Sequence, residues 1–131
     1  MRIRTEEELP VFERLGDVRS RAVTLGQIAD ILQDRGQLDE ALRIRKEELL
    51  PVFERLGNVR ELIVGRVNLA LCLVKRGKAE DVQEIVGLLA WSYSHARERG
   101  YAEADQIASF LTQLGLPPDH LSSITAQAAK Q

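Results

Sequence analysis

The residue types that carry most catalytic and metal chemistry are sparse in this chain, which has two histidines and one cysteine. A metal site needs three or four convergent ligands, and His95, His120 and Cys72 belong to no HExxH or CxxC pattern. Ser94 precedes His95 and Asp119 precedes His120, but adjacent residues on a helix point apart, so neither pair suggests a catalytic triad. Cys72 lies in a very apolar stretch, which favours a small buried side chain over a nucleophile. We therefore expect no enzyme activity, no metal site and no cofactor.

The composition is that of an ordinary soluble domain. The chain has 131 residues, enough for one domain, with 18 basic and 20 acidic side chains and a net charge of -2. This even balance gives no basic patch of the kind that binds nucleic acid. No apolar run is long enough to cross a membrane, no apolar signal-peptide core occurs near the N-terminus, and a single cysteine cannot form an internal disulfide. We expect a cytoplasmic protein without nucleic-acid or membrane partners.

Residues 2–19 and residues 43–60 are two copies of one sequence, RIRTEEELPVFERLGDVR and RIRKEELLPVFERLGNVR. When the two copies are aligned, 15 of 18 positions are identical, which indicates an internal duplication. Beyond residue 60 fewer positions match, but the pairs at 28–29 and 35–36 still correspond to those at 69–70 and 76–77. We expect the related blocks to take the same shape.

Glycines divide the chain into segments of helical length. Six of the nine glycines are spaced at steps of 20, 21, 20, 23 and 15 along the chain, namely Gly16, Gly36, Gly57, Gly77, Gly100 and Gly115. Glycine tolerates the left-handed backbone that ends many helices, and the apolar residues between these glycines recur every three or four positions. The pattern predicts an all-α protein of seven antiparallel helices, near residues 3–15, 18–35, 38–56, 59–76, 79–99, 101–114 and 118–129.

Two prolines occupy the same position of the duplicated sequence, inside expected helices. Pro10 and Pro51 each remove a backbone donor and crowd the carbonyl four residues earlier. Because the proline recurs, we interpret it as a kink within a continuous helix. The alternative is a pair of short helices that meet near residue 50.

The string IADILQDRGQLDEAL, residues 28–42, resembles the tetratricopeptide repeat, which has a small residue in its first helix, a glycine at the turn and an alanine in its second helix. Here these are Ala29, Gly36 and Ala41, and the 41-residue period is similar to the long variety seen in kinesin light chain. The resemblance implies a right-handed α-solenoid of about 2.5–3 units. Its parts would be a half unit at 2–16, full units at 17–57 and 58–100, and a degenerate unit or C-terminal cap at 101–131.

In tetratricopeptide arrays the first helices line a concave groove that holds a peptide or a partner helix. Carried over position by position, the resemblance places nine residues on this groove: Gln27, Asp30, Asp34, Val64, Asn68, Leu71, Lys75, Gln106 and Ser109. Asn68 matches an asparagine with which chaperone-type repeats hold a terminal carboxylate. The companion positions carry Gly26 and Asp30, however, and Asp30 would repel a carboxylate. The alternative is that these nine are merely exposed helix residues.

Residues 2–15 match only the last part of a repeat unit, the second half of its second helix. The first helix that would pair with them in such a unit has no counterpart in the chain. An uncovered apolar edge tends to associate with other protein surfaces, so we expect self-association, as a symmetric dimer. The candidate residues for it are Ile3, Val11, Phe12, Leu88 and Trp91. The alternative for the helix face that carries Leu88 and Trp91, and the favoured one, is that it packs into the core.

These observations favour a non-catalytic scaffold for protein–protein interaction, with a peptide or partner helix bound in the groove. Two alternatives stay open. The chain is a homo-oligomeric structural unit whose edges meet each other, or it is a regulatory, sensor-type fragment of a larger bacterial multidomain protein.

Overall fold

The computed structural model describes the backbone of residues 2–116, and within that range all regular structure is helical, without a strand. Five helices pack against one another. They are α1 (Arg2–Asp34), a second helix made of α2 (Leu38–Arg43), the π-helical segment η1 (Ile44–Leu49) and α3 (Leu50–Leu56), then α4 (Val59–Arg76), α5 (Val82–Glu98) with a leading 3-10 turn η2 (Ala79–Asp81), and α6 (Glu103–Gln113). The all-α prediction is confirmed. The expected seventh helix at 118–129 lies outside the described residues.

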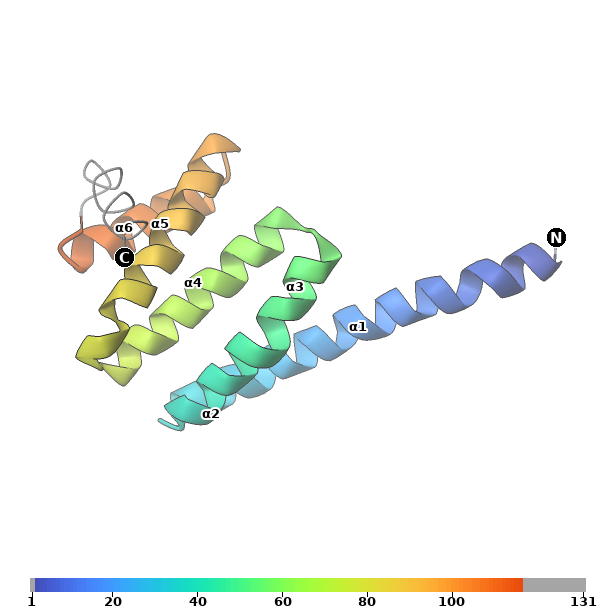
Figure 1. Ribbon diagram of the computed structural model, residues 1–131, viewed down its shortest axis with the longest axis horizontal. Helices are drawn as coiled ribbons and strands as arrows, with labels where there is room; N and C mark the ends of the chain where they lie inside the picture. The colour runs from blue at the N-terminus through green and yellow to red at the C-terminus, as the bar shows by residue number, and fades with distance from the viewer. Residues whose placement is uncertain (1, 117–131) are drawn as a thin grey trace.

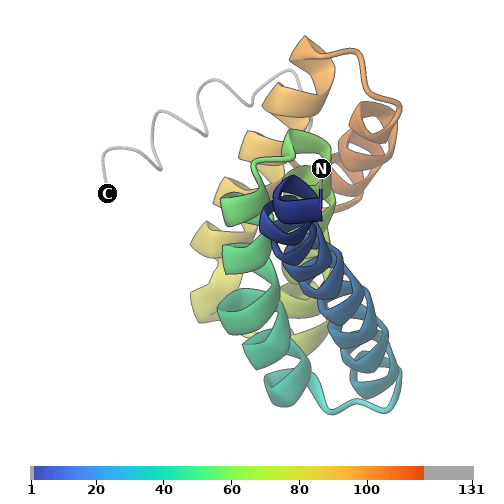
Figure 2. The ribbon, with the colours of Figure 1, turned by 90° about the vertical axis from the view of Figure 1, so that its right-hand side faces the viewer.

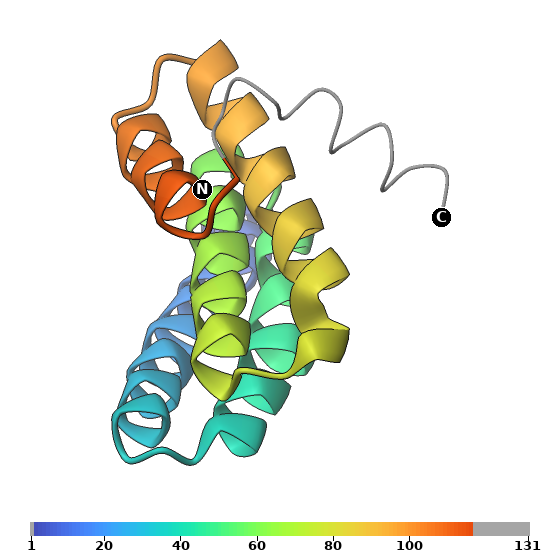
Figure 3. The same ribbon diagram turned by 90° about the vertical axis from the view of Figure 1, so that its left-hand side faces the viewer.

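The helices form two layers. Helices α1, α4 and α6 lie on one side of the molecule, and α2–η1–α3 and α5 lie on the other (Figure 2 and Figure 3). Consecutive helices pack against each other, so that α4 lies between α3 and α5 in the middle of the molecule (Figure 1). The largest fully buried aliphatic side chains belong to α4, α5 and α6: Ile63, Leu69, Leu89, Ile107 and Leu111.

Five of the six turn glycines end a helix, as predicted. Their φ angles lie between 69° and 80°, the left-handed region that other residues rarely enter, at Gly36, Gly57, Gly77, Gly100 and Gly115. At one of these turns Asn58 also caps the next helix, because its side chain accepts a hydrogen bond from the backbone N–H of Glu61 at 3.0 Å.

The sixth glycine does not end a helix, so the prediction of separate helices at 3–15 and 18–35 is wrong. Gly16 lies inside α1, which runs without interruption for 33 residues. The first half of α1 projects beyond all the other helices (Figure 1). The related blocks 2–19 and 43–60 therefore differ in shape, although 15 of their 18 positions are identical.

We infer the reason for this difference from a close contact between α3 and α4. A Cβ atom placed on Gly65 of α4 would lie 2.8 Å from the ring of Phe53 and 3.3 Å from Leu50, so a larger residue would force these side chains to shift. At the 41-residue spacing of the duplication, the residue that corresponds to Gly65 is Thr24, which carries a β-branched side chain. A hairpin at Gly16 built like the one at Gly57 would press residue 12 against this side chain. Keeping a glycine inside a helix costs only about 1 kcal/mol, so α1 stays straight.

Neither repeated proline breaks its helix, and the alternative of two helices meeting at residue 50 is wrong. The backbone of α1 is helical through Pro10. Just before Pro51 the second helix widens into the π-helical segment η1, where Leu50 donates its N–H to the carbonyl of Arg45, five residues back. Such a local widening relieves the crowding that proline imposes on a regular helix.

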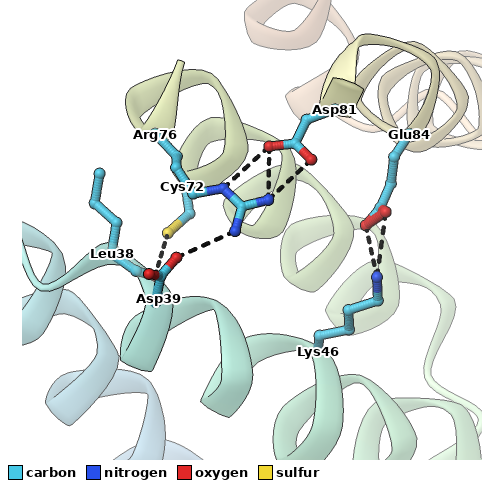
Figure 4. A network of polar contacts seen from close by, with 7 residues as sticks. All are labelled: Leu38, Asp39, Lys46, Cys72, Arg76, Asp81 and Glu84. Atoms are coloured by element: carbon cyan, nitrogen blue, oxygen red, sulfur yellow. Dashed lines mark hydrogen bonds and ion pairs between the residues drawn. The ribbon is translucent and has the colours of Figure 1, made fainter. Parts of the chain in front are cut away.

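Charged side chains align neighbouring helices. Arg76, at the end of α4, donates to Asp81 at 2.7 Å and to Asp39 at 3.1 Å, and Lys46 of η1 pairs with Glu84 of α5 at 3.0 Å (Figure 4). These contacts join the starts of the two second helices. Partly exposed ion pairs of this kind contribute roughly 0–1 kcal/mol each, so their main effect is on alignment.

One ion pair is repeated along the chain. Arg19 of α1 bonds to Glu61 of α4 at 2.6 Å, and Arg60 of α4 bonds to Glu103 of α6 at 2.9 Å. Arg19 and Arg60 occupy the same position in the two copies of the duplicated sequence. The α1–α4 and α4–α6 neighbours are therefore connected in the same way.

We expect Gly65→Ala to lower the free energy of unfolding by about 1–3 kcal/mol, because the new methyl group overpacks the contact with Phe53. Gly87→Ala is the matched control, since Gly87 also lies within a helix but no atom outside the helix backbone is within 4 Å of a Cβ there. That change should raise the free energy of unfolding by about 0.5–1 kcal/mol. Urea unfolding followed by Trp91 fluorescence measures both. Equal effects of the two substitutions would contradict the proposed role of Gly65.

Candidate partner-binding face

The nine predicted groove residues all lie on the layer formed by α1, α4 and α6, and we call the solvent side of this layer the groove face (Figure 3). Helix α1 contributes Gln27, Asp30 and Asp34, α4 contributes Val64, Asn68, Leu71 and Lys75, and α6 contributes Gln106 and Ser109. The structure brings five of the nine into two cavities that lie on either side of α4.

The first cavity is apolar and lies between α4 and α6, with a volume of about 190 Å³. Four predicted residues line it, namely Val64, Asn68, Leu71 and Gln106, together with Ile63, Val67, Glu103, Ile107 and Phe110. An apolar cavity of roughly 150 Å³ is enough to hold a benzene ring. This cavity therefore has room for one large apolar side chain, with two amide side chains at its edge.

A fixed carboxylate marks one end of this apolar cavity. Glu103 accepts two hydrogen bonds from the guanidinium of Arg60, at 2.9 and 3.0 Å, and these bonds hold the pKa of the Glu103 carboxyl below its usual range. Arg60 also lies over the ring of Tyr101, 5.2 Å from its centre. Because the Glu103 carboxylate is already paired, the apolar lining and the free amides are the groups that would select a ligand.

The second cavity is smaller and more polar than the first. It lies between α1 and α4, has a volume of about 80 Å³, and is lined by Ala22, Gly26, Asp30, Arg45, Leu49, Phe53, Gly65 and Asn68. Arg45 reaches it from η1 with only 5% of its surface exposed. Its guanidinium donates to Asp30 at 2.5 Å and to Gln33 at 3.2 Å, while its Nε finds no acceptor among the described residues. Arg45 thus balances the charge of Asp30, the residue expected to repel a carboxylate.

Asn68 lines both cavities and is the centre of the groove face. Its side-chain amide can donate and accept at once, as a peptide backbone requires. The other predicted groove residues line neither cavity. Lys75 donates to the backbone carbonyl of Gln33 at 3.3 Å, and Gln27, Asp34 and Ser109 are exposed on the same layer.

Several residues that line these cavities were not predicted from the sequence, among them Phe110 and Arg45. Phe110 supplies the only ring among the residues that line the apolar cavity. Its place in the last expected helix turns before Gly115 could have been used to predict that it packs near α4. Arg45 gave no comparable signal, because a charged residue in a polar-looking segment suggests exposure. Its burial depends on Asp30 and Gln33, which belong to a different helix.

The residues expected to mediate self-association lie elsewhere. The side chains of Ile3, Val11 and Phe12 lie outside the described part of the structure. Leu88 and Trp91 are half-buried and pack against the main core. Trp91 is covered further by His95, stacked at 3.9 Å, and by the guanidinium of Arg66, 4.1 Å from the ring centre.

Cys72 is fully buried, and burial raises the pKa of its thiol, which disfavours the nucleophilic thiolate. No three His, Cys, Asp or Glu side chains within the described range are placed to bind a metal ion. Among the described helices, none combines the length and the apolar character that crossing a bilayer requires.

We expect Asp30→Ala to lower the free energy of unfolding more than Arg45→Met does. The first change leaves a buried guanidinium with a weaker set of acceptors, at a cost of roughly 1–3 kcal/mol, whereas the second replaces a buried charge by an apolar side chain of similar length and should be nearly neutral. Urea unfolding of the two variants in parallel measures the difference. A larger loss for Arg45→Met would mean that the ion pair itself stabilises the fold.

Comparisons of the chain with models of protein families, with curated proteins and with solved structures found no match.

Proposed function

We propose that this chain is a non-catalytic protein–protein interaction module that binds a peptide or a partner helix on its groove face. The observation that carries the proposal is the apolar cavity between α4 and α6, in which Val64, Asn68, Leu71 and Gln106 meet. Binding sites of this kind combine an apolar pocket with a few fixed polar groups. One large apolar side chain of the partner would fill the cavity, and Asn68 and Gln106 would hydrogen-bond its backbone.

The proposed architecture is a right-handed α-solenoid of the long tetratricopeptide type. Its support is the internal duplication, the left-handed glycines that end successive helices, and the equivalent ion pairs Arg19–Glu61 and Arg60–Glu103. In such an array each unit contacts only its neighbours, and the first helices form one continuous surface. A cytoplasmic location and a scaffold role are part of the same proposal.

The test starts from a displayed peptide library, from which binders of the purified chain are selected. We expect selected peptides to share a large apolar residue, because the cavity accepts one such side chain. Asn68→Arg should weaken binding of a selected peptide at least tenfold, since the longer side chain occupies the cavity edge. Ser94→Arg on the exposed side of α5 is the matched control and should leave the affinity unchanged. Calorimetric titration measures both, and equal affinities for the two variants would exclude the groove face.

Self-association is a second candidate, favoured by apolar residues on α1. Val23, Ile28 and Ile31 are 62%, 42% and 51% exposed, whereas Leu69, the equivalent of Ile28, is 1% exposed because neighbouring helices cover α4 on both sides. A second copy of the chain would cover this side of α1 and form a homodimer. A role as the regulatory part of a larger multidomain protein is a third candidate that no described contact tests.

Light scattering after size exclusion decides the second candidate. A homodimer should appear at micromolar concentration and become a monomer in Ile28→Lys, because a charge then lies in the apolar contact. Val82→Lys places the same charge on an exposed valine of α5 and should leave the dimer intact. A wild-type monomer at all concentrations would exclude self-association through α1.

A further inference from the structure

The polar cavity between α1 and α4 is lined by a buried cation whose hydrogen bonds are incomplete. Arg45 is only 5% exposed, and its hydrogen bonds to Asp30 and Gln33 both come from Nη2. Its Nη1 and Nε groups donate to no oxygen of a described residue, although Nε is buried. A buried donor without a partner destabilises the folded state, so a ligand that brings an acceptor to this guanidinium gains affinity.

Two glycines leave the space in this cavity. Gly26 of α1 and Gly65 of α4 are among its lining residues, and neither contributes a side chain. A Cβ atom added at Gly26 would have no atom outside the helix backbone within 4 Å, so the space beside it is open. A cavity needs roughly 10–15 Å³ to admit one water molecule, and the volume of about 80 Å³ therefore has room for the end of a short side chain.

The charges that line the cavity restrict which group can enter it. Arg45 and Asp30 neutralise each other, so a carboxylate would be repelled by Asp30 and an ammonium group by Arg45. An apolar side chain would leave the donors of Arg45 without acceptors. Asp30 is 68% exposed along its side chain and accepts from Arg45 through Oδ1, which leaves Oδ2 to accept from a ligand. The cavity therefore suits an uncharged group that accepts and donates at once.

The side-chain amide of asparagine or glutamine is a group of this kind. Its oxygen would accept from the guanidinium of Arg45, and its NH₂ group would donate to Oδ2 of Asp30. A serine or threonine hydroxyl has a single hydrogen and a shorter reach, so it would satisfy fewer of these groups. Among uncharged side chains, the amide is thus the best match to the cavity.

The polar cavity is close enough to the apolar cavity for one peptide to reach both. The two cavities lie on opposite sides of α4 and share Asn68 as a lining residue. Neighbouring helices pack about 8–10 Å apart, so the two cavities are separated by a similar distance. An extended peptide rises about 3.3 Å per residue and covers this distance in about three residues.

We propose that the polar cavity binds the side-chain amide of an asparagine or glutamine of the partner, two to four residues from the large apolar residue that fills the apolar cavity. The groove face then recognises a pair of uncharged residues, and Asn68 lies between them to hold the peptide backbone. This inference rests on the proposed binding of a peptide to the groove face and adds the identity of the second residue that is recognised.

Calorimetric titration of the full chain with peptides selected from the displayed library tests the ligand side. Selected peptides should share an asparagine or glutamine at this spacing from the large apolar residue. Its replacement by leucine should weaken binding at least tenfold, because the donors of the cavity then lose their acceptor. Its replacement by aspartate or glutamate, which keeps the shape and adds a charge, should weaken binding as much. The same replacements at a peptide position outside the pair are the control and should leave the affinity unchanged.

Variants of the chain test the cavity side. Gly26→Leu fills the cavity and should weaken binding of the amide-containing peptide at least tenfold. Gly87→Leu is the matched control, because Gly87 also has no atom outside the helix backbone within 4 Å of a Cβ but lies on α5, and it should leave the affinity unchanged. In Arg45→Met the amide peptide and its leucine version should bind with equal affinity. Circular dichroism of each variant confirms that the helices are retained.

The outcomes separate this inference from the proposed function. Selected peptides without an amide at this spacing, or peptides that bind Gly26→Leu as tightly as the wild type, would overturn the inference and leave the cavity to water. If Asn68→Arg still weakens binding of those peptides, the groove face remains the binding surface. A library that yields no binder would overturn both proposals.

Discussion

The close contact between α3 and α4 is the constraint on which the rest of the structure depends. Because Gly65 has no side chain, Phe53 and Leu50 approach the backbone of α4, and the turn at Gly57 can bring the two helices together. The other side of α4 packs along α5 through fully buried residues such as Leu69. Helix α4 thereby connects the two halves of the molecule. No helix pair hides its apolar surface alone, so each depends on the next one for stability.

The position of α4 also determines where a partner could bind. Since α4 lies between α1 and α6 on the groove face, Asn68 borders a polar cavity on one side and an apolar cavity on the other. The polar cavity contains a charge pair that is already balanced, Arg45 with Asp30, and the apolar one has a paired carboxylate at its end. In the apolar cavity, the lining side chains other than this carboxylate are therefore two amides and apolar groups. That composition favours an uncharged, partly apolar segment of a partner over an ionic one.

Much of this arrangement could be predicted from spacing alone. The duplication and the glycines located five helix ends, because a left-handed turn depends on the residue at that position. Gly16 does not end a helix, although its neighbours match those of Gly57. We attribute the difference to the residue that a folded-back helix would contact, which is Gly65 after Gly57 but Thr24 after Gly16. The repeat placed Asn68 and Gln106, which line the apolar cavity, on one face, but it gave no indication of Arg45. Its burial depends on contacts between helices that no local pattern contains.

We expect packing between helices, and not the local sequence, to decide whether each copy of the duplicated segment bends. Spin labels at residues 6 and 34 and, in a second sample, at the equivalent residues 47 and 75 test this directly, in a background where Cys72 is replaced by alanine. A straight α1 places residues 6 and 34 about 42 Å apart, from the 1.5 Å rise per residue. Pulsed electron resonance should find this distance for the first pair and a much shorter one for the second. Equal distances in the two samples would show that both copies fold back alike, which would contradict a deciding role for packing at Gly65.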